Sequence, residues 1–323
     1  MPKMTRLIFT TATALLLSLT ASVSQQVPDQ SVTPKLGSSD IAILQSSAEK
    51  GDVAAERKLA QAYDEGNGIS QNDALAAMWY RKAADQGDAD AQNGLGVMCR
   101  YGRGVEKNKD EAVRWYHKAA KQGNATAMFN LGAAYYNGDE GVHTSLDMAY
   151  VWFLLSQEAG NAQAKEAVAR TAKELPSTAD ALVDIGAMYE KGEDLPKNPA
   201  QAERWYGEAA KLSDSAKVLL ATMLINGRGV PKDYPRALEL CKAAADHRNE
   251  SAQFCVGYLY QNGFGVQKNP TEAVKWYQLA ATNGILREIH SQATHALAEM
   301  YAKGDGVPAD RVEAYYWFFL AWR

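Results

Sequence analysis

Few residues in this chain are placed to do chemistry. The histidines are scattered, and none pairs with a carboxylate and a second histidine at the spacing of a helical metal site; they are His117, His143, His247, His290 and His295. Serine-nucleophile signatures, Gly-x-Ser-x-Gly or Ser-x-x-Lys with its companion motifs, do not occur. The sequence therefore predicts no enzyme, no metal and no other cofactor.

One glycine-rich stretch, residues 102–124 (GRGVEKNKDEAVRWYHKAAKQGN), could hold a phosphate or a metal. A dinucleotide loop, however, needs a preceding strand and a third glycine. A calcium loop has an acidic first ligand, where this stretch has Gly102. We interpret it as a connection between two helices whose polar side chains are solvated or cap a helix.

This loop recurs along the chain. Successive loop glycines lie 36, 36, 54, 35, 36 and 41 residues apart, and a large apolar residue follows each one after thirteen or fourteen residues. Such a period indicates a repeat array rather than ordinary domains. The glycines are Gly66, Gly102, Gly138, Gly192, Gly227, Gly263 and Gly304, and the apolar residues are Trp79, Trp115, Trp152, Trp205, Leu240, Trp276 and Trp317.

Each unit contains two amphipathic helical stretches. The first reads A-x-x-x-L-G-x-x-Y, as in residues 127–135, where the spacing of four places Ala127, Leu131 and Tyr135 on one face. The second reads A-x-x-W-Y-x-x-A-A. Loop glycines end the first helix, and a capping residue starts the second. Neither helix can bury its stripe alone, so the units must stack. The caps are Asn72, Asn108, Ser145, Asn198, Asp233, Asn269 and Asp310.

These motifs resemble the Sel-one-like repeats (SLR), relatives of tetratricopeptide repeats, over about residues 40–323. The resemblance implies an all-α fold, a right-handed α/α superhelical solenoid of helix-turn-helix repeats. It also implies a non-catalytic scaffold that holds a protein partner on the concave face, lined by first helices. The alternative is a β-lactam-binding or β-lactamase-like hydrolase, as for Cys-rich relatives, whose regular paired cysteines this chain lacks.

The chain divides into six predicted segments. Lys3 and Arg6 precede an apolar run at 7–19 and small residues at 22–24, which is the pattern of a signal peptide over 1–24. An uncleaved anchor is the alternative. A flexible linker (25–38), a capping helix (39–53), three units (54–160), an inserted helix (161–179) and four units (180–323) follow. We expect an exported bacterial protein, periplasmic or secreted, with no membrane span after signal cleavage.

Charge limits the kind of partner. The chain has 34 basic and 38 acidic residues and a net charge of −4, without a basic patch. Nucleic acid is therefore an unlikely ligand class, and a protein of unknown identity is the expected partner.

The three cysteines, Cys99, Cys241 and Cys255, leave at least one thiol unpaired. Cys241 takes a slot that is aromatic in the other units and should be buried. Cys255 takes a slot that is polar or glycine elsewhere and should be exposed, which argues against a Cys241–Cys255 disulfide without excluding it. His117 takes a slot that is Arg, Lys or Gln in other units, so it should be solvated.

Slots of the first helices that vary while the repeat frame stays fixed are the predicted partner contacts. Among them Tyr136 and Tyr258 are the expected anchors, because binding hot spots favour tyrosine. The set is Val97, Arg100, Ala133, Tyr136, Ala187, Glu190, Tyr258 and Gln261.

The last stretch, AYYWFFLAWR, is predicted to leave an apolar surface. Part of it should pack on the first helix of its unit through Leu297 and Tyr301, and the rest should remain uncovered. We expect either self-association through this end or a chain shortened relative to its relatives.

Overall fold

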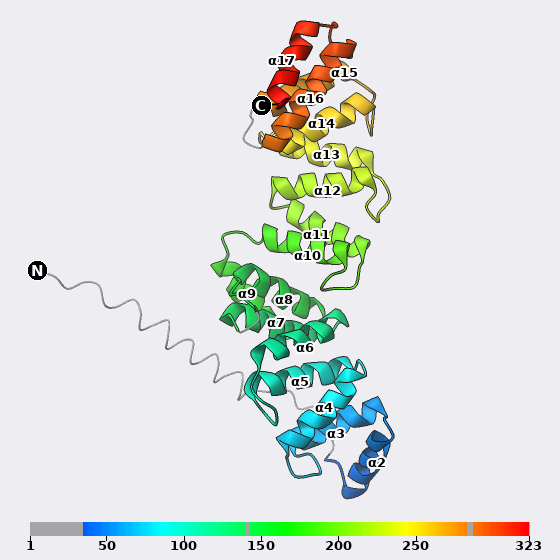
Figure 1. The fold of residues 1–323 in the computed structure, drawn as a ribbon, viewed down its shortest axis with the longest axis vertical. Coiled ribbons are helices and arrows are strands. Elements are labelled where there is room, and N and C mark those ends of the chain that lie inside the picture. Colours follow the sequence, from blue (N-terminus) through cyan, green and yellow to red (C-terminus); the bar gives the residue numbers. More distant parts are fainter. Residues whose placement is uncertain (1–34, 140–141, 283–286, 323) are drawn as a thin grey trace, which may run out of the picture.

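The computed structural model describes residues 35–139, 142–282 and 287–322, and in these residues all regular secondary structure is helical. Consecutive helices pack as antiparallel neighbours and stack along one long axis, with α2 at one end and α17 at the other (Figure 1). The array is a right-handed α/α solenoid. The helices are α2 (Ser38–Glu49), α3 (Val53–Glu65), α4 (Asp73–Asp85), α5 (Ala89–Tyr101), α6 (Lys109–Lys121), α7 (Ala125–Asn137), α8 (Leu146–Glu158), α9 (Ala164–Glu174), α10 (Ala179–Lys191), α11 (Pro199–Ala210), α12 (Asp214–Asn226), α13 (Tyr234–Ala245), α14 (Glu250–Asn262), α15 (Pro270–Thr282), α16 (Arg287–Lys303) and α17 (Arg311–Trp322).

Helix ends follow the repeat code. Gly66 ends α3 in the left-handed region at φ 69°, and its N–H donates to Ala62. Asn72 then starts α4 by accepting a hydrogen bond from the Leu75 N–H at 3.0 Å. Because such caps satisfy amide groups that a helix terminus leaves open, they fix where each helix begins.

In four of the seven units a glycine of the first helix is set against an aromatic ring of the second. A Cβ added to Gly96 would lie 2.6 Å from the Tyr116 ring, and one on Gly186 would lie 2.5 Å from the Tyr206 ring. The glycines of the A-x-x-x-L-G motif therefore allow close approach of the second helix of the same unit. The conserved tryptophan slot is likewise in or next to the core, as at Trp152.

The inserted helix α9 interrupts the regular stacking. Both α9 and α10 pack on α8, where an ordinary unit would receive a single first helix. The loop after α10 also reaches back to α6, since the Lys121 Nζ donates to the Glu193 carbonyl at 2.9 Å.

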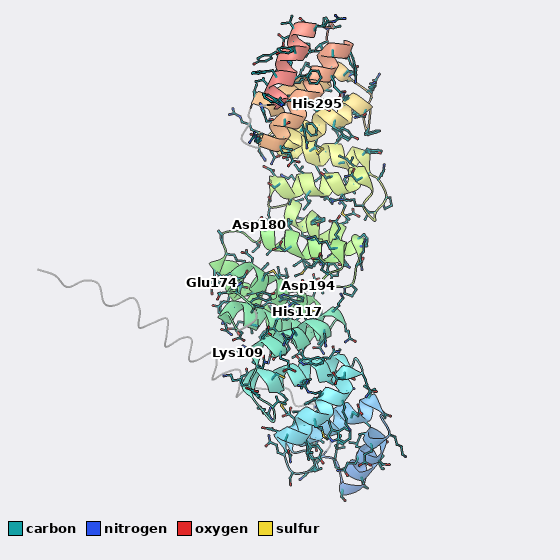
Figure 2. The ribbon with its side chains drawn as sticks, viewed as in Figure 1. Lys109, His117, Glu174, Asp180, Asp194 and His295 are labelled. Carbon is teal, nitrogen blue, oxygen red and sulfur yellow. A yellow bond between two sulfur atoms is a disulfide. The ribbon has the colours of Figure 1, made fainter. Side chains whose placement is uncertain are left out.

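The exposed position predicted for His117 is wrong. His117 is half-buried, its ring meets Trp152 edge-on with centroids 5.5 Å apart, and its Nδ1 lies 3.5 Å from the Asp194 carboxylate (Figure 2). Burial lowers the pKa of His117, and the Asp194 charge opposes that shift. The equivalent residues Arg81, Lys242 and Gln278 are also partly buried, and at His117 the folded-back loop adds the Asp194 carboxylate.

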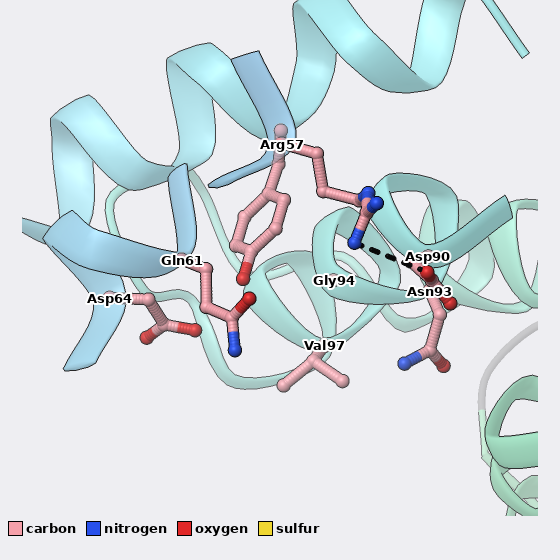
Figure 3. Close-up of a pocket in the computed structure, with 8 residues that line it drawn as sticks. Arg57, Gln61, Asp64, Asp90, Asn93, Gly94 and Val97 are labelled. Carbon is pink, nitrogen blue, oxygen red and sulfur yellow. Dashed lines mark ion pairs between the residues drawn. The ribbon is translucent and has the colours of Figure 1, made fainter. Parts of the chain in front are cut away.

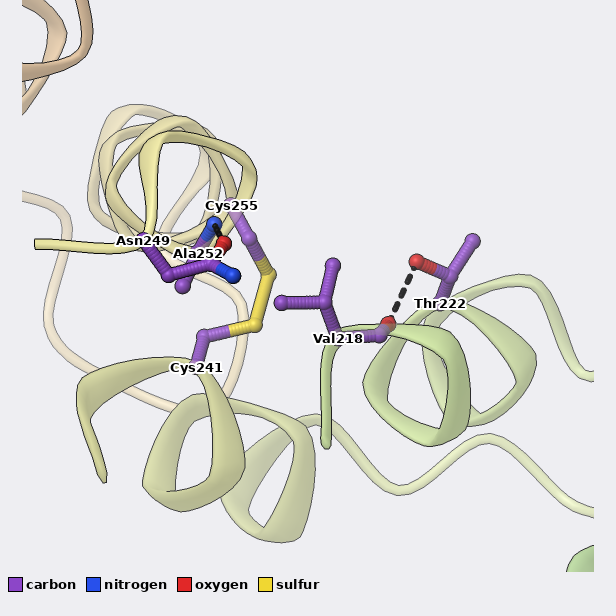
Figure 4. The surroundings of a disulfide bond; sticks show 6 residues. All are labelled: Val218, Thr222, Cys241, Asn249, Ala252 and Cys255. Atoms are coloured by element: carbon purple, nitrogen blue, oxygen red, sulfur yellow. Dashed lines mark hydrogen bonds between the residues drawn. A yellow bond between two sulfur atoms is a disulfide. The ribbon is translucent and has the colours of Figure 1, made fainter. Parts of the chain in front are cut away.

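The prediction for Cys255 is also wrong. Cys255 is buried and forms a disulfide with Cys241 (Figure 4). The slot of Cys255 faces the second helix of the preceding unit. Tyr80 and Gly94 show the same relation, since a Cβ on Gly94 would lie 2.8 Å from the Tyr80 ring. Cys99 is a free, buried thiol.

Two boundaries differ from expectation. Gly37 caps α2, which therefore begins before residue 39, the predicted start of the capping helix, and the Gly37 N–H donates to the Asp40 carboxylate at 2.9 Å. Leu36, placed in a flexible linker by the sequence, donates its N–H to the Asn67 side chain at 3.0 Å. The predicted signal peptide and most of the predicted linker lie outside the described residues.

Candidate protein-binding face

The first helices of the units, α3, α5, α7, α10, α12, α14 and α16, form the candidate surface, here called the first-helix face. First helices of neighbouring units contact each other, as α12 does α14 and α14 does α16. Two rows of side chains run along this face. Row A lies five residues before the loop glycine of each unit, and row B lies two residues before it.

Row A varies in size and polarity while the frame around it repeats. Its members are partly exposed, and Tyr258 is the most open of the predicted contacts at 37% exposure. Four predicted residues belong to it, Val97, Ala133, Ala187 and Tyr258. The complete row is Gln61, Val97, Ala133, Ala187, Thr222, Tyr258 and Glu299.

Row B contains the other four predicted residues, and some of its side chains form hydrogen bonds within the protein. The Tyr206 hydroxyl donates to the Glu190 carboxylate at 2.7 Å, and the Tyr277 hydroxyl donates to Gln261 Oε1 at 2.8 Å. Burial raises the pKa of both tyrosines, and the Glu190 charge adds to the rise at Tyr206, so both remain hydrogen-bond donors. Row B is Asp64, Arg100, Tyr136, Glu190, Ile225, Gln261 and Ala302.

Arg100 and Glu190 also pair with charged groups of the next unit. The Arg100 guanidinium lies 2.8 Å from the buried Asp139 carboxylate, which Lys109 contacts at 2.8 Å as well. Glu190 lies 3.3 Å from the Arg228 guanidinium. The charged groups of Arg100 and Glu190 are therefore already paired with other charged groups of the protein.

A cleft of about 410 Å³ opens on the first-helix face between α3 and α5. Figure 3 shows Gln61 and Val97 of row A on its wall, and Arg57 paired with Asp90 at 3.3 Å. Sequence reasoning named only Val97 of this cleft. Extending rows A and B to the first unit would have added Gln61 and Asp64. The lining is Arg57, Gln61, Asp64, Tyr80, Asp90, Asn93, Gly94 and Val97.

The inserted helix divides the face. The Tyr136 hydroxyl donates to the Glu174 carboxylate of α9 at 3.0 Å, so α9 lies beside α7. The predicted contacts on α5 and α7 are thereby separated from those on α10 and α14, and the structure does not bring the eight residues into one site.

Nothing in the described part of the chain resembles a metal centre, because no three His, Cys, Asp or Glu side chains gather closely enough to hold an ion. None of the described helices combines the length and apolar character needed to cross a bilayer.

Comparison with known families accounts for the repeat. The Sel1 repeat model matches seven segments, 53–88, 89–124, 125–161, 179–214, 215–249, 250–285 and 291–321. The chain belongs to the Sel1-repeat family. This Sel1-repeat chain is thereby placed among non-catalytic scaffold proteins, in agreement with the absence of a predicted active site.

Similar proteins include regulators and biosynthesis factors. Chitin synthase regulatory factor 4 of Schizosaccharomyces pombe is 34% identical over 121 residues, 36% of this chain and 18% of that protein. The alginate biosynthesis protein AlgK of Azotobacter vinelandii is 32% identical over 107 residues, 33% of this chain and 22% of that protein. The aligned region thus spans about a fifth of each relative.

Two further matches cover more of the chain. The Sel1-repeat-containing protein YjcO of Escherichia coli K12 is 25% identical over 194 residues, 58% of this chain and 76% of that protein. A protective antigen of uropathogenic Escherichia coli with an SLR fold is 32% identical, with a TM-score of 0.45, and the match covers 87% of this chain and 56% of the antigen.

Proposed function

We propose that this Sel1-repeat protein is an exported scaffold or adaptor of a bacterial cell envelope or secreted fraction, and that it holds a protein partner on the concave first-helix face. The observation that carries the proposal is row A. Its side chains are partly exposed and differ from unit to unit, and the Tyr258 hydroxyl, unlike Glu190 and Gln261 of row B, takes part in none of the hydrogen bonds found in the described residues. Variable accessible slots on a fixed frame are how solenoids acquire specificity.

The chemistry of row A changes along the array, which favours an extended partner segment. Gln61 and Val97 lie by the polar cleft of the first two units, next to Arg57. Tyr258 lies in the sixth unit, where Phe264 meets its ring edge-on with centroids 5.9 Å apart. A partner with polar groups at one end and an apolar or aromatic side chain at the other fits this gradient.

Export is supported by two independent features. The first is the basic, apolar and small-residue order of residues 1–24. The second is the Cys241–Cys255 disulfide, since disulfides persist mainly in oxidising compartments. A fusion of the chain to alkaline phosphatase, which is active only after export, tests this part: activity that requires residues 1–24 is expected, and an inactive fusion contradicts it.

Partner binding is tested with row A variants. A partner captured from envelope extract is titrated against the parent, Tyr258→Ala, Val97→Asp and a control, Glu239→Lys, which changes an exposed residue of a second helix. We expect affinity to fall by about tenfold or more in the two row A variants, the effect of a hot-spot residue, and to stay unchanged in the control.

Reversing the charge of Arg100 or Glu190 is a poorer test, because each is paired internally and its reversal also perturbs the fold. Equal affinity of the parent and both row A variants contradicts the concave-face proposal. For the hydrolase alternative, turnover of a chromogenic β-lactam by the purified protein is the test, and no observation favours it.

A further inference from the structure

Helix α17 has an outer face of large apolar side chains. Tyr315, Tyr316 and Trp322 are 74%, 51% and 85% exposed, and Val312 is 78% exposed. Positions 312, 315, 316 and 319 follow the three- and four-residue spacing of one helical stripe, so they share a side of α17. We call Val312, Tyr315, Tyr316, Phe319 and Trp322 the α17 outer face.

Another helix in the same chain has almost the same sequence and is covered. Counted from their caps Ser145 and Asp310, α8 reads AYVWFLLS where α17 reads AYYWFFLA. Tyr150 and Val151 of α8 are 8% and 0% exposed, against 74% and 51% for Tyr315 and Tyr316 in the same slots. The burial of α8 therefore shows what kind of element this sequence accepts.

At three equivalent positions, the residues of α8 and α17 differ in polarity from those of the other second helices. In α8 they hold Val151, Leu154 and Leu155, and in α17 they hold Tyr316, Phe319 and Leu320. Each of the other five second helices has a Lys or Arg in at least one of these slots; examples are Arg114 and Lys118 in α6 and Lys275 in α15. Charged side chains at these positions are stable when they face solvent, whereas apolar residues at all three positions are typical of a helix that another element covers.

The covering element of α8 is α9. Its apolar side is made of small and medium residues: Ala164 and Thr171 are buried, and Val168, Ala172 and Leu175 pack against the core. Its opposite side is charged and includes Lys165 and Glu166. A short amphipathic helix of this kind fits between large aromatic and aliphatic side chains.

A further ordinary unit does not fit on α17. In five units the slot of Trp322 holds a buried alanine, against which the next first helix packs: Ala84, Ala120, Ala210, Ala245 and Ala281. Trp322 leaves no room for that packing. The equivalent residue of α8, Gln157, is also large and is exposed beside α9, so α17 again follows α8.

An open cavity lies where such a helix would begin. It measures about 500 Å³ and lies between α16 and α17, next to Phe318, Ala321 and Trp322 (its His295 is marked in Figure 2). This is the end of α17 that corresponds to the end of α8 from which the chain enters α9.

From these observations we propose that the α17 outer face is a docking site for an amphipathic helix with the chemistry of α9, a narrow stripe of Ala, Val, Thr and Leu with Lys and Glu opposite. This docking site is separate from the first-helix face.

The probe is a labelled peptide of residues 160–178, acetylated and amidated, titrated into the full chain and followed by fluorescence anisotropy. We expect saturable binding that weakens about tenfold or more in Tyr316→Glu, because a carboxylate is costly to bury in an apolar contact. The matched control is Lys275→Glu, which introduces the same glutamate at the equivalent position of α15. This variant should bind the peptide like the parent. Circular dichroism establishes that both variants are folded.

Because a short peptide pays a nucleation cost before it can dock, a second arm joins residues 159–178 to the chain after Arg323. Its thermal midpoint should exceed that of the same fusion carrying Val168→Asp in the added segment. Either Tyr316-dependent binding in trans or this rise supports the site, and the absence of both overturns it. A dimer in sedimentation velocity that Tyr316→Glu abolishes also overturns it, since a second copy would then cover α17.

Discussion

Gly186 and Gly207 lie in the same unit, and replacing each with alanine should have opposite effects. Both are helical, so each substitution gains roughly 1 kcal/mol in helix propensity. At Gly207 a Cβ meets nothing within 4 Å, and that gain stands. At Gly186 the Cβ would lie 2.5 Å from the Tyr206 ring, so the ring must move.

The cost of moving Tyr206 depends on its surroundings. The first unit has Ala60 in the slot of Gly186, and there the tyrosine ring is received by Gly94 of the next unit. For Tyr206 of the fourth unit, the receiving slot in the fifth unit holds Leu219, so Tyr206 has no such space. Overpacking costs about 1–3 kcal/mol, and displacement of the ring also weakens the Tyr206–Glu190 hydrogen bond.

We therefore expect Gly207→Ala to stabilise by up to about 1 kcal/mol and Gly186→Ala to destabilise by about 1–3 kcal/mol. Urea and thermal unfolding, followed by far-ultraviolet circular dichroism, measure both variants against the parent. Midpoints are compared, because a repeat array can lose its units in steps. If Gly186→Ala unfolds at the same midpoint as Gly207→Ala, the glycine–tyrosine packing is not what selects glycine at this slot.

Three further outcomes are expected. Gly227→Val should destabilise by about 1–3 kcal/mol, since φ is 66° and a β-branched residue is strained there, and an unchanged thermal midpoint contradicts this. Reduction of the Cys241–Cys255 disulfide should cost about 2–3 kcal/mol for its short loop, with no effect of reductant on a Cys255→Ala variant. Burial lowers the folded-state pKa of His117, so the folded protein binds fewer protons than the unfolded chain, and stability should fall as pH decreases from about 6.5. His117→Gln should lose part of this dependence, whereas a parent that gains stability on acidification would show that the Asp194 charge dominates.

Local sequence determines most of the fold. Helix limits follow from loop glycines and caps that act over a few residues, as at Gly66 and Asn72, and these can be read from the sequence alone. The contacts of His117 could not be read from the sequence, because they depend on a distant loop, after α10, that folds back onto α6 beyond the inserted helix.

The Cys241–Cys255 disulfide can be predicted from the sequence. Cys241 and Cys255 occupy the same two slots as Tyr80 and Gly94, and both pairs are separated by fourteen residues. A glycine where other units have polar residues is a sign that a bulky side chain of the preceding unit approaches it. The slot was misjudged as exposed because polar residues such as Asn130 occupy it elsewhere without being fully solvated.

Variation between units has two physical causes that a single sequence cannot separate. A slot can vary because it meets a partner, or because it must complement another varying slot of the same protein. Where a row B residue lies opposite a tyrosine, it varies because it must complement that neighbouring position of the same protein. Glu190 and Gln261 face Tyr206 and Tyr277, whereas Ile225 stands in the unit whose aromatic slot is Cys241.

Among the hydrogen bonds and ion pairs found in the described residues, none joins a row A side chain to the second helix of its own unit; Gln61 and Glu299 bond within their own helices, and Tyr258 meets Phe264. Val97 and Tyr258 differ greatly in volume, yet the helices that carry them, α5 and α14, have the same length and the same kinds of cap, Asp88 or Asn249 before the helix and a glycine after it. Intramolecular complementarity therefore accounts for changes in row B at Glu190 and Gln261. Under the proposed function, specificity is expected to change with Val97 and Tyr258 rather than with Arg100 and Glu190, whose charges are paired within the protein.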